Sequence, residues 1–133
     1  MSIDIKFRGK RFNNGKWAYG YYIFEDGEHA IMTQANTKRV LIYNQVIFET
    51  VGQYTGIKDK NGKGKDVYKD DIVSCEEFDD EGKYREWGII QWHDNGWKWN
   101  YRGEGKEWWE LDELENIKII GNTHEKEVHK CLQ

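Results

Sequence analysis

Residues Thr50 to Ser74 have the sequence TVGQYTGIKDKNGKGKDVYKDDIVS, and this stretch decides the fold. Two short apolar segments, Val51–Ile57 and Val67–Val73, flank a run of Lys, Asp, Asn and Gly. Because Gly, Asn and Asp favour turn conformations, the run between the two segments must reverse the chain. The stretch therefore predicts two strands joined by a short, lysine-rich connection.

Outward from this stretch, turn signals recur at short intervals. Asn-Gly or Asp-Gly pairs suit the left-handed positions of tight hairpin turns, and they occur at Asn14-Gly15, Asp26-Gly27, Asn61-Gly62 and Asn95-Gly96, with Glu81-Gly82 as a further turn. The segments between the turns are rich in aromatic and β-branched residues and alternate with period two. They predict strands at Trp17–Ile23, His29–Thr33, Arg39–Tyr43, Val46–Glu49, Asp71–Cys75, Trp87–His93, Gly96–Tyr101 and Ile117–Asn122. The fold class that follows is all-β, a short-stranded antiparallel meander closed into a small barrel or sandwich.

One segment near the C-terminal end has a helical pattern instead. Trp108, Leu111 and Leu114 stand at helix-like spacing, which predicts one short helix over residues 108–116.

Composition limits the broad class of protein. The chain has 133 residues, a net charge of −4 and a pI near 5.6, with a mean hydropathy of −0.96. We expect one soluble, cytoplasmic domain, because no apolar run reaches the length of a membrane span and residues 1–4 lead into no signal-like segment. The acidic balance argues against a dedicated nucleic-acid binder. Cys75 and Cys131 are expected to be two reduced thiols.

Three stretches carry a resemblance to a known family. The central block "TVGQYTGIKDKNGK" followed by "VYKDDIV" closely resembles the YopX family of phage and prophage proteins, and the opening "IKFRGKRFNNGKWAYGYY" and the closing "LENIKIIGNTHE" agree in the same order. The resemblance implies an SH3-like barrel over residues 50–123, with an N-terminal β subdomain over residues 1–49 packed on it. It also implies self-association, with a trimer among the candidates, and it implies no reaction, because the family has no established activity. The chain departs from the family pattern at Asp70, where a turn glycine is usual.

No catalytic or metal-binding motif emerges from the spacing of polar residues. The neighbouring pairs Asp70-Asp71, His93-Asp94 and His124-Glu125 would point to opposite faces of a strand. The four histidines, His29, His93, His124 and His129, lack metal-ligand spacing. The acidic stretch Glu76–Gly82 is expected to be a solvated loop rather than a calcium site. We therefore expect no catalytic residue, no metal and no cofactor, and an enzyme site assembled across strands is the alternative that the sequence leaves open.

The lysine-rich connection is the candidate anion-contacting site. Its lysines are Lys58, Lys60, Lys63 and Lys65. The glycines between them could present backbone N–H groups to a phosphate, but the Walker A spacing fails. A solvated hairpin tip, kept soluble by its lysines, explains the same residues.

The aromatic residues of the second half form the candidate binding patch. Six of the seven tryptophans fall between Trp87 and Trp109, more than a core of this size can enclose. The patch is predicted to comprise Trp97, Trp99, Tyr101, Trp108 and Trp109. Such a surface serves a protein partner, a second copy of the chain, or stacked bases.

These observations lead to one functional hypothesis and a rival. We expect a phage- or prophage-encoded, non-enzymatic binding and self-association module that meets a phage or host protein in the bacterial cytoplasm. The rival is a nucleic-acid-binding accessory protein that uses the lysine-rich connection beside the aromatic patch.

Overall fold

The computed structural model describes residues 6–34 and 40–125. The chain divides into two compact units, Met1–Gly56 and Ile57–Gln133. The division falls within strand β5 (Gly52–Lys58). The chain is mostly antiparallel β-structure, as its alternating pattern predicted.

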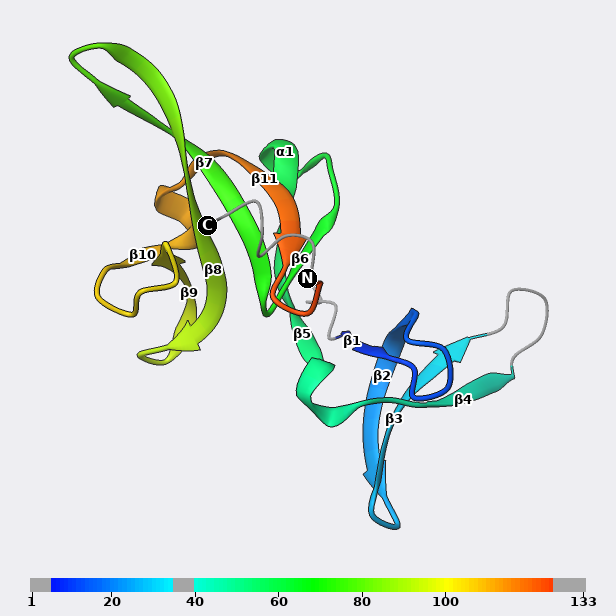
Figure 1. The fold of residues 1–133 in the computed structure, drawn as a ribbon. Helices are drawn as coiled ribbons and strands as arrows, with labels where there is room; N and C mark the ends of the chain where they lie inside the picture. Colours follow the sequence, from blue (N-terminus) through cyan, green and yellow to red (C-terminus); the bar gives the residue numbers. More distant parts are fainter. Residues whose placement is uncertain (1–5, 35–39, 126–133) are drawn as a thin grey trace. The chain divides into compact units, whose positions relative to one another are not determined.

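The first unit contains β4, β3, β2, β1 and most of β5, which are neighbours in that order in one sheet, and β6 (Asp66–Tyr68) follows β5 in the strand order of that sheet (Figure 1). Its strands besides β5 are β1 (Phe7–Lys10), β2 (Trp17–Glu25), β3 (Glu28–Gln34) and β4 (Leu41–Gln45). The predicted Asp26-Gly27 turn joins β2 to β3, with φ angles of 52° and 79° that match a type I′ hairpin. Ala18, Ile31 and Val46 form the core of this unit.

The prediction of a strand at Val46–Glu49 is wrong beyond Val46. Val46 makes a single β-bridge to Arg11, and Phe48–Thr50 form the 3-10 helix η1. The Thr50 hydroxyl donates to the Ile47 carbonyl at 2.6 Å and accepts from the Lys10 N–H at 2.8 Å. This side chain stabilises a turn in place of a strand ladder.

The second unit is built on a five-stranded antiparallel sheet in the order β10-β9-β8-β7-β11. Its strands are β7 (Asp71–Asp79), β8 (Gly82–His93), β9 (Gly96–Tyr101), β10 (Trp108–Glu110) and β11 (Glu115–Asn122). Ahead of the sheet, the short helix α1 (Asp59–Gly62) leads to β6 (Asp66–Tyr68). Within the described residues the strand order has two ends, so the sheet is open and not a closed barrel.

The short helix predicted over residues 108–116 is not present. Trp108–Glu110 pair with β9, Leu111–Glu113 form the 3-10 helix η2, and β11 begins at Glu115. Aromatic residues favour strands, and the pairing with β9 overrides a helical spacing that three apolar residues produce by coincidence. Buried Leu111 holds the 3-10 turn in the core.

The acidic stretch Glu76–Gly82 is also not the loop that was predicted. Glu76 to Asp79 continue β7, paired with Lys83, Arg85 and their neighbours on β8, and only Asp80 and Glu81 turn between the strands. Glu76 lies 3.5 Å from the Lys83 ammonium and 3.9 Å from the Arg85 guanidinium. Opposite charges across the strands thus support a long hairpin where the composition predicted a solvated loop.

The lysine-rich connection reverses the chain as predicted, and buried Asp59 organises it. The Asp59 carboxylate accepts from the Lys65 N–H at 2.6 Å and from the Ile119 N–H of β11 at 3.1 Å. Gly64 must lack a side chain, because a Cβ there would lie 1.9 Å from Asp59 Oδ1. Lys60 and Asn61 both adopt left-handed backbone angles, so α1 is a compact turn and not a regular helix.

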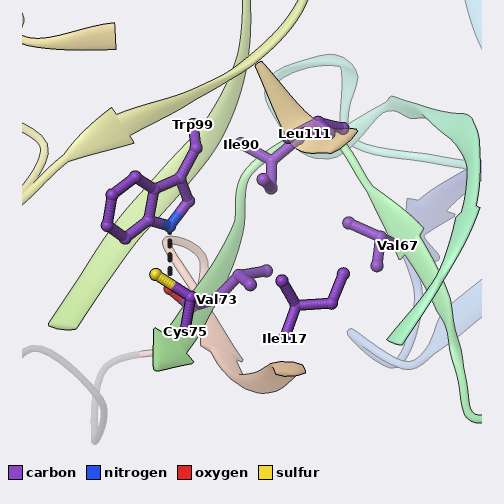
Figure 2. Close-up of a cluster of buried hydrophobic side chains, with 7 residues drawn as sticks. All are labelled: Val67, Val73, Cys75, Ile90, Trp99, Leu111 and Ile117. Atoms are coloured by element: carbon purple, nitrogen blue, oxygen red, sulfur yellow. Dashed lines mark hydrogen bonds between the residues drawn. The ribbon is translucent and has the colours of Figure 1, made fainter. Parts of the chain in front are cut away.

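The core of the second unit gathers side chains from five strands and from η2 (Figure 2). Its buried members are Val67, Val73, Cys75, Ile90, Trp99, Leu111 and Ile117. The Trp99 indole N–H donates to the Val73 carbonyl at 3.0 Å, which satisfies the one polar atom of the largest buried side chain.

None of the helices in the described part of the chain is long and apolar enough to cross a membrane.

Candidate binding site

The aromatic residues of the predicted patch lie on both faces of the five-stranded sheet. Register places Trp109 opposite Trp99 and places Trp108 opposite Asn100. Trp97, Trp99, Tyr101 and Trp109 therefore share one face, and Trp108 lies on the other. There Trp108 stacks on His93, with ring centroids 3.8 Å apart and planes at 7°.

The aromatic residues on the first face are not equally exposed. Trp99 is 1% exposed and belongs to the core, so it is not part of a surface patch. Trp97, Tyr101 and Trp109 are half-buried against that core. Beside Trp97 lies Trp92, which is 59% exposed and meets the Trp97 ring edge-on at 5.2 Å.

A cavity of about 170 Å³ opens on this face, where the apolar core gives way to the β7–β8 hairpin. We call it the acidic cavity. Its lining residues are Glu77, Tyr84, Glu86, Trp99, Tyr101, Glu107 and Trp109.

The alternation of β7 and β8 explains this lining. Val73, Cys75 and Glu77 follow one another at period two on β7, and Tyr84 pairs with Glu77 while Glu86 pairs with Cys75. The face is thus apolar near the middle of the sheet and acidic toward the hairpin tip. Gly88 makes room for the aromatic floor, because a Cβ there would lie 2.6 Å from the Trp99 ring.

The third carboxylate reaches the acidic cavity from the connection between β9 and β10. The Glu107 carbonyl accepts from the Tyr101 N–H at 3.0 Å, which holds this connection against the end of β9. The Glu107 carboxylate accepts from the Trp109 indole N–H at 3.1 Å. Trp109 is thereby oriented with its ring toward the cavity and its N–H toward an acceptor.

The acidic cavity concentrates negative charge beside aromatic rings. Burial and then Glu77 raise the pKa of Tyr84, and burial and then Glu86 raise the pKa of Tyr101. The Arg102 guanidinium lies 3.1 Å from Glu86 and 5.2 Å from the Tyr101 ring centroid. Three carboxylates against this one guanidinium leave a surplus of negative charge, which suits a cationic ligand.

The thiol beside the acidic cavity is held in its neutral form. Burial and then Glu77 raise the pKa of the nearby Cys75 thiol to about 11, so the thiol is protonated at neutral pH. The acidic cavity thus combines carboxylates with aromatic rings.

A comparison with models of known protein families identifies the family of this chain. A family model described as "YopX protein" matches residues 6–128. The chain belongs to the YopX family. Among curated proteins, no sequence matches it.

In this YopX-family protein the predicted lysines do not border the acidic cavity. Lys58, Lys60, Lys63 and Lys65 are exposed around the α1 turn, and Lys58 forms an ion pair with Asp66 at 3.2 Å. Asp59, at the centre of the turn, is 2% exposed and bonded to the main chain, which gives the loop a structural organisation.

One acid–base pair that the sequence could not suggest joins two distant segments of the YopX-family chain. His124 Nε2 lies 3.0 Å from Asp70 Oδ2, and the Thr123 N–H donates to the Asp70 carbonyl at 3.0 Å. Asp70 has a φ of 71°, a left-handed angle that aspartate tolerates. These bonds tether the chain after β11 to the start of β7.

The described histidines occupy three separate surroundings. His29 lies against Tyr22, Phe24 and Phe48, while His93 stacks on Trp108 and His124 meets Asp70. Across residues 6–34 and 40–125, no three His, Cys, Asp or Glu side chains gather as metal ligands would. His129 and Cys131 lie outside the described residues, and the absence of a metal requirement stays a prediction.

Sequence reasoning missed the carboxylates of the acidic cavity. The acidic composition of residues 76–82 predicts a loop at Glu77, and Glu86 lies just before the predicted strand Trp87–His93. The period-two spacing of Cys75 and Glu77, and of Tyr84, Glu86 and Gly88, was the signal that could have found them.

Proposed function

We propose that this YopX-family protein is a non-enzymatic binding module that holds a cationic side chain of a partner protein in the acidic cavity. The observation that carries the proposal is the convergence of Glu77, Glu86 and Glu107 with the rings of Tyr101 and Trp109 in one cavity. Ammonium and guanidinium groups are attracted both to carboxylates and to the faces of aromatic rings.

The dimensions of the cavity support a side chain as its occupant. Pockets for whole small-molecule ligands have volumes of roughly 300–1,000 Å³, whereas the acidic cavity has about 170 Å³. A lysine or arginine side chain fits the smaller space and lets its apolar stem lie along Trp109. Single contacts of this kind contribute about 0.5–2 kcal/mol, so the side chain would anchor a larger interface.

The rival function, nucleic-acid binding, has weaker support from charge. Residues 57–133 carry thirteen Lys and Arg against nineteen Asp and Glu, a net charge of −6. The lysine-rich connection therefore belongs to the acidic unit of the chain. Phosphates would be repelled by the same carboxylates that attract a cation.

The biological setting in this proposal follows the YopX membership. The protein acts in the bacterial cytoplasm during phage or prophage gene expression, binds a phage or host protein, and self-associates. Within this proposal the second unit is an open variant of the SH3-like barrel, in which the long strands β7 and β8 supply Val73, Cys75 and Ile90 to the core of Figure 2.

A nuclear magnetic resonance titration that follows the amide and indole N–H resonances tests whether the acidic cavity binds a cationic side chain. We expect N-acetyl-lysine methylamide or its arginine counterpart to shift the Trp109 indole N–H resonance with millimolar affinity, and N-acetyl-glutamate methylamide to leave it unchanged. Glu77→Gln and Glu107→Gln should each weaken binding about threefold to tenfold. Glu113→Gln removes one charge from exposed η2 and serves as the matched control.

Two results would contradict the proposal. One is equal shifts with the lysine and glutamate compounds. The other is equal loss of binding in Glu77→Gln and Glu113→Gln, which would reduce the effect to overall charge.

A further inference from the structure

Strand β4 is an edge strand whose sequence lacks the usual protection against pairing. Residues 40–48, VLIYNQVIF, contain no charged residue and no proline. Val40, Leu41, Ile42 and Tyr43 are each 46 to 52% exposed. Natural edge strands generally carry lysine, proline or a bulge that prevents another strand from adding to them.

The hydrogen bonds of β4 identify which backbone groups face outward. The Val46 N–H donates to the His29 carbonyl, so even-numbered residues of this segment direct their N–H and C=O groups toward β3. Odd-numbered residues direct them away, and the Gln45 carbonyl accordingly accepts from the Phe12 N–H. Leu41 and Tyr43 therefore present N–H and C=O groups at the open edge, with no backbone partner among the described residues.

We propose that β4 pairs antiparallel with β4 of a second copy of this chain, about a twofold axis at Ile42. In this register Leu41 faces Tyr43 of the second copy, and Tyr43 faces its Leu41. Both facing pairs consist of outward groups, so each exchanges two N–H to C=O bonds and the interface gains about four in total. The two Ile42 side chains meet at the axis as a close pair without hydrogen bonds.

A second copy is the occupant that fits this edge because the segment is self-complementary. A twofold axis places each residue of β4 beside itself or a near neighbour, which is destabilising for a charged strand and favourable for an apolar one. Leu41 and Tyr43 lie on the same sheet face as Tyr21, which is 63% exposed, so the aromatic surface would continue across the paired sheets. This inference names an interface for the self-association in the proposed function, and rests on that part of it alone.

Gel filtration with light scattering tests the interface on the full-length protein. We expect the wild type to be a dimer of about 32 kDa, twice the 15.9 kDa chain, at tens of micromolar. Ile42→Lys and Ile42→Glu should each raise the dimer dissociation constant about 100-fold, because each places like charges directly opposite one another. An equimolar mixture of the two variants should restore a dimer, since lysine then faces glutamate.

Two further variants separate this edge from other surfaces. Leu41→Pro removes an outward N–H at the first residue of β4, and it should dissociate the dimer while leaving the pairing with β3 intact. Tyr21→Lys adds a charge on central strand β2 and should leave the dimer unchanged. Trp109→Ala alters the acidic cavity and should likewise leave it unchanged.

The possible failures point to different errors. A wild type that stays monomeric at about 100 micromolar would contradict both the β4 interface and the self-association in the proposed function. An oligomer that persists in Ile42→Lys, or that dissociates in Trp109→Ala instead, would overturn the β4 interface and leave self-association standing. A mixture of the two Ile42 variants that stays monomeric would overturn the register.

Discussion

At the scale of single residues, Cys75 marks where the apolar core ends and the acidic cavity begins. Its side chain is fully buried, and Glu77 follows on the same face of β7. A thiol in this position is favoured while neutral, because ionisation would place a second negative charge beside Glu77 in a poorly hydrated site. Cys75 is therefore a packing residue whose proton is held tightly.

The first prediction concerns stability at alkaline pH. Burial and then Glu77 raise the pKa of Cys75 to about 11 in the folded protein, whereas an unfolded chain has a thiol pKa of about 8.5. The folded state thus retains a proton that the unfolded state loses. The contribution to the free energy of unfolding is complete below about pH 8.5 and falls by up to roughly 3 kcal/mol as pH approaches 11.

Urea unfolding of the wild type and of Cys75→Ala at pH 8 and pH 10.5 isolates this effect. Tyr84 and Tyr101 titrate in both proteins, so their contributions cancel in the difference. The stability advantage of the wild type should shrink at the higher pH. An advantage that is equal at both pH values would show that the thiol is not held neutral by folding.

At the scale of elements, the α1 turn is fixed to the sheet by one carboxylate. Asp59 bonds the Lys65 N–H within the turn and the Ile119 N–H on β11. Asn61 adds a bond from its side-chain amide to Asn116 at 3.1 Å, and Asn116 donates in turn to Glu76 at 2.8 Å. The α1 turn is thus tied to the last strand through side chains, whereas Asp71–Ser74 of the stretch that decides the fold pair with β11 in a strand ladder.

The second prediction is that Asp59→Asn destabilises the protein by about 1–3 kcal/mol. The amide is isosteric with the carboxylate but replaces one acceptor by a donor, so either the Lys65 or the Ile119 N–H loses its partner. Urea unfolding at pH 7 measures the cost. Asp94→Asn, an exposed substitution in a left-handed turn position that asparagine accepts, should change stability by less than about 0.5 kcal/mol.

The sequence predicted the elements whose alternation and turns agree locally. β9 has the predicted bounds, and the Asp26-Gly27 turn lies where the dipeptide indicated. The β8–β9 turn is shifted by one residue, because Asp94 and Asn95 take the left-handed positions and Gly96 begins β9. β10 and the end of β7 were missed because their pairing depends on distant strands, which overrode helical spacing at Trp108 and acidic composition at Glu76.

The candidate site was less predictable than the fold. The sequence identified Tyr101 and Trp109, but it could not tell them from Trp99, which the same alternation carries into the core. Which aromatic side chains on one face of a strand are buried depends on the segments that pack against that face. Here Gly88, which leaves room for the indole ring, and the Val73 carbonyl, which accepts its N–H, decide that Trp99 is enclosed.

At the scale of the whole molecule, charge is divided unevenly between the two units. Residues 1–56 carry seven Lys and Arg against five Asp and Glu, a net charge of +2, while residues 57–133 have a net charge of −6. The uncharged edge of β4 belongs to the first unit and the acidic cavity to the second. The proposed self-association and partner binding therefore rely on different forces, apolar strand pairing in one unit and charge attraction in the other.

This division leads to the last prediction. Any affinity for nucleic acid is expected to be weak, because few lysine side chains can contact phosphates. The exposed lysines of the α1 turn are Lys58, Lys60, Lys63 and Lys65, and Lys58 is already paired with Asp66. At most about three phosphate contacts follow, which gives a slope of log K against log salt of roughly −2 to −3 on duplex DNA. At physiological salt the dissociation constant should be weaker than about 10⁻⁴ M.

Fluorescence anisotropy with a labelled DNA duplex at several salt concentrations measures both quantities. Lys60→Gln combined with Lys63→Gln should reduce the slope by about two at low salt and abolish detectable binding at physiological salt. Lys16→Gln combined with Lys106→Gln removes the same charge from other exposed positions and should change the slope much less. Tight, sequence-selective binding at physiological salt would instead favour the nucleic-acid accessory function, because an acidic unit can reach such affinity only through an organised phosphate site that outweighs its net repulsion.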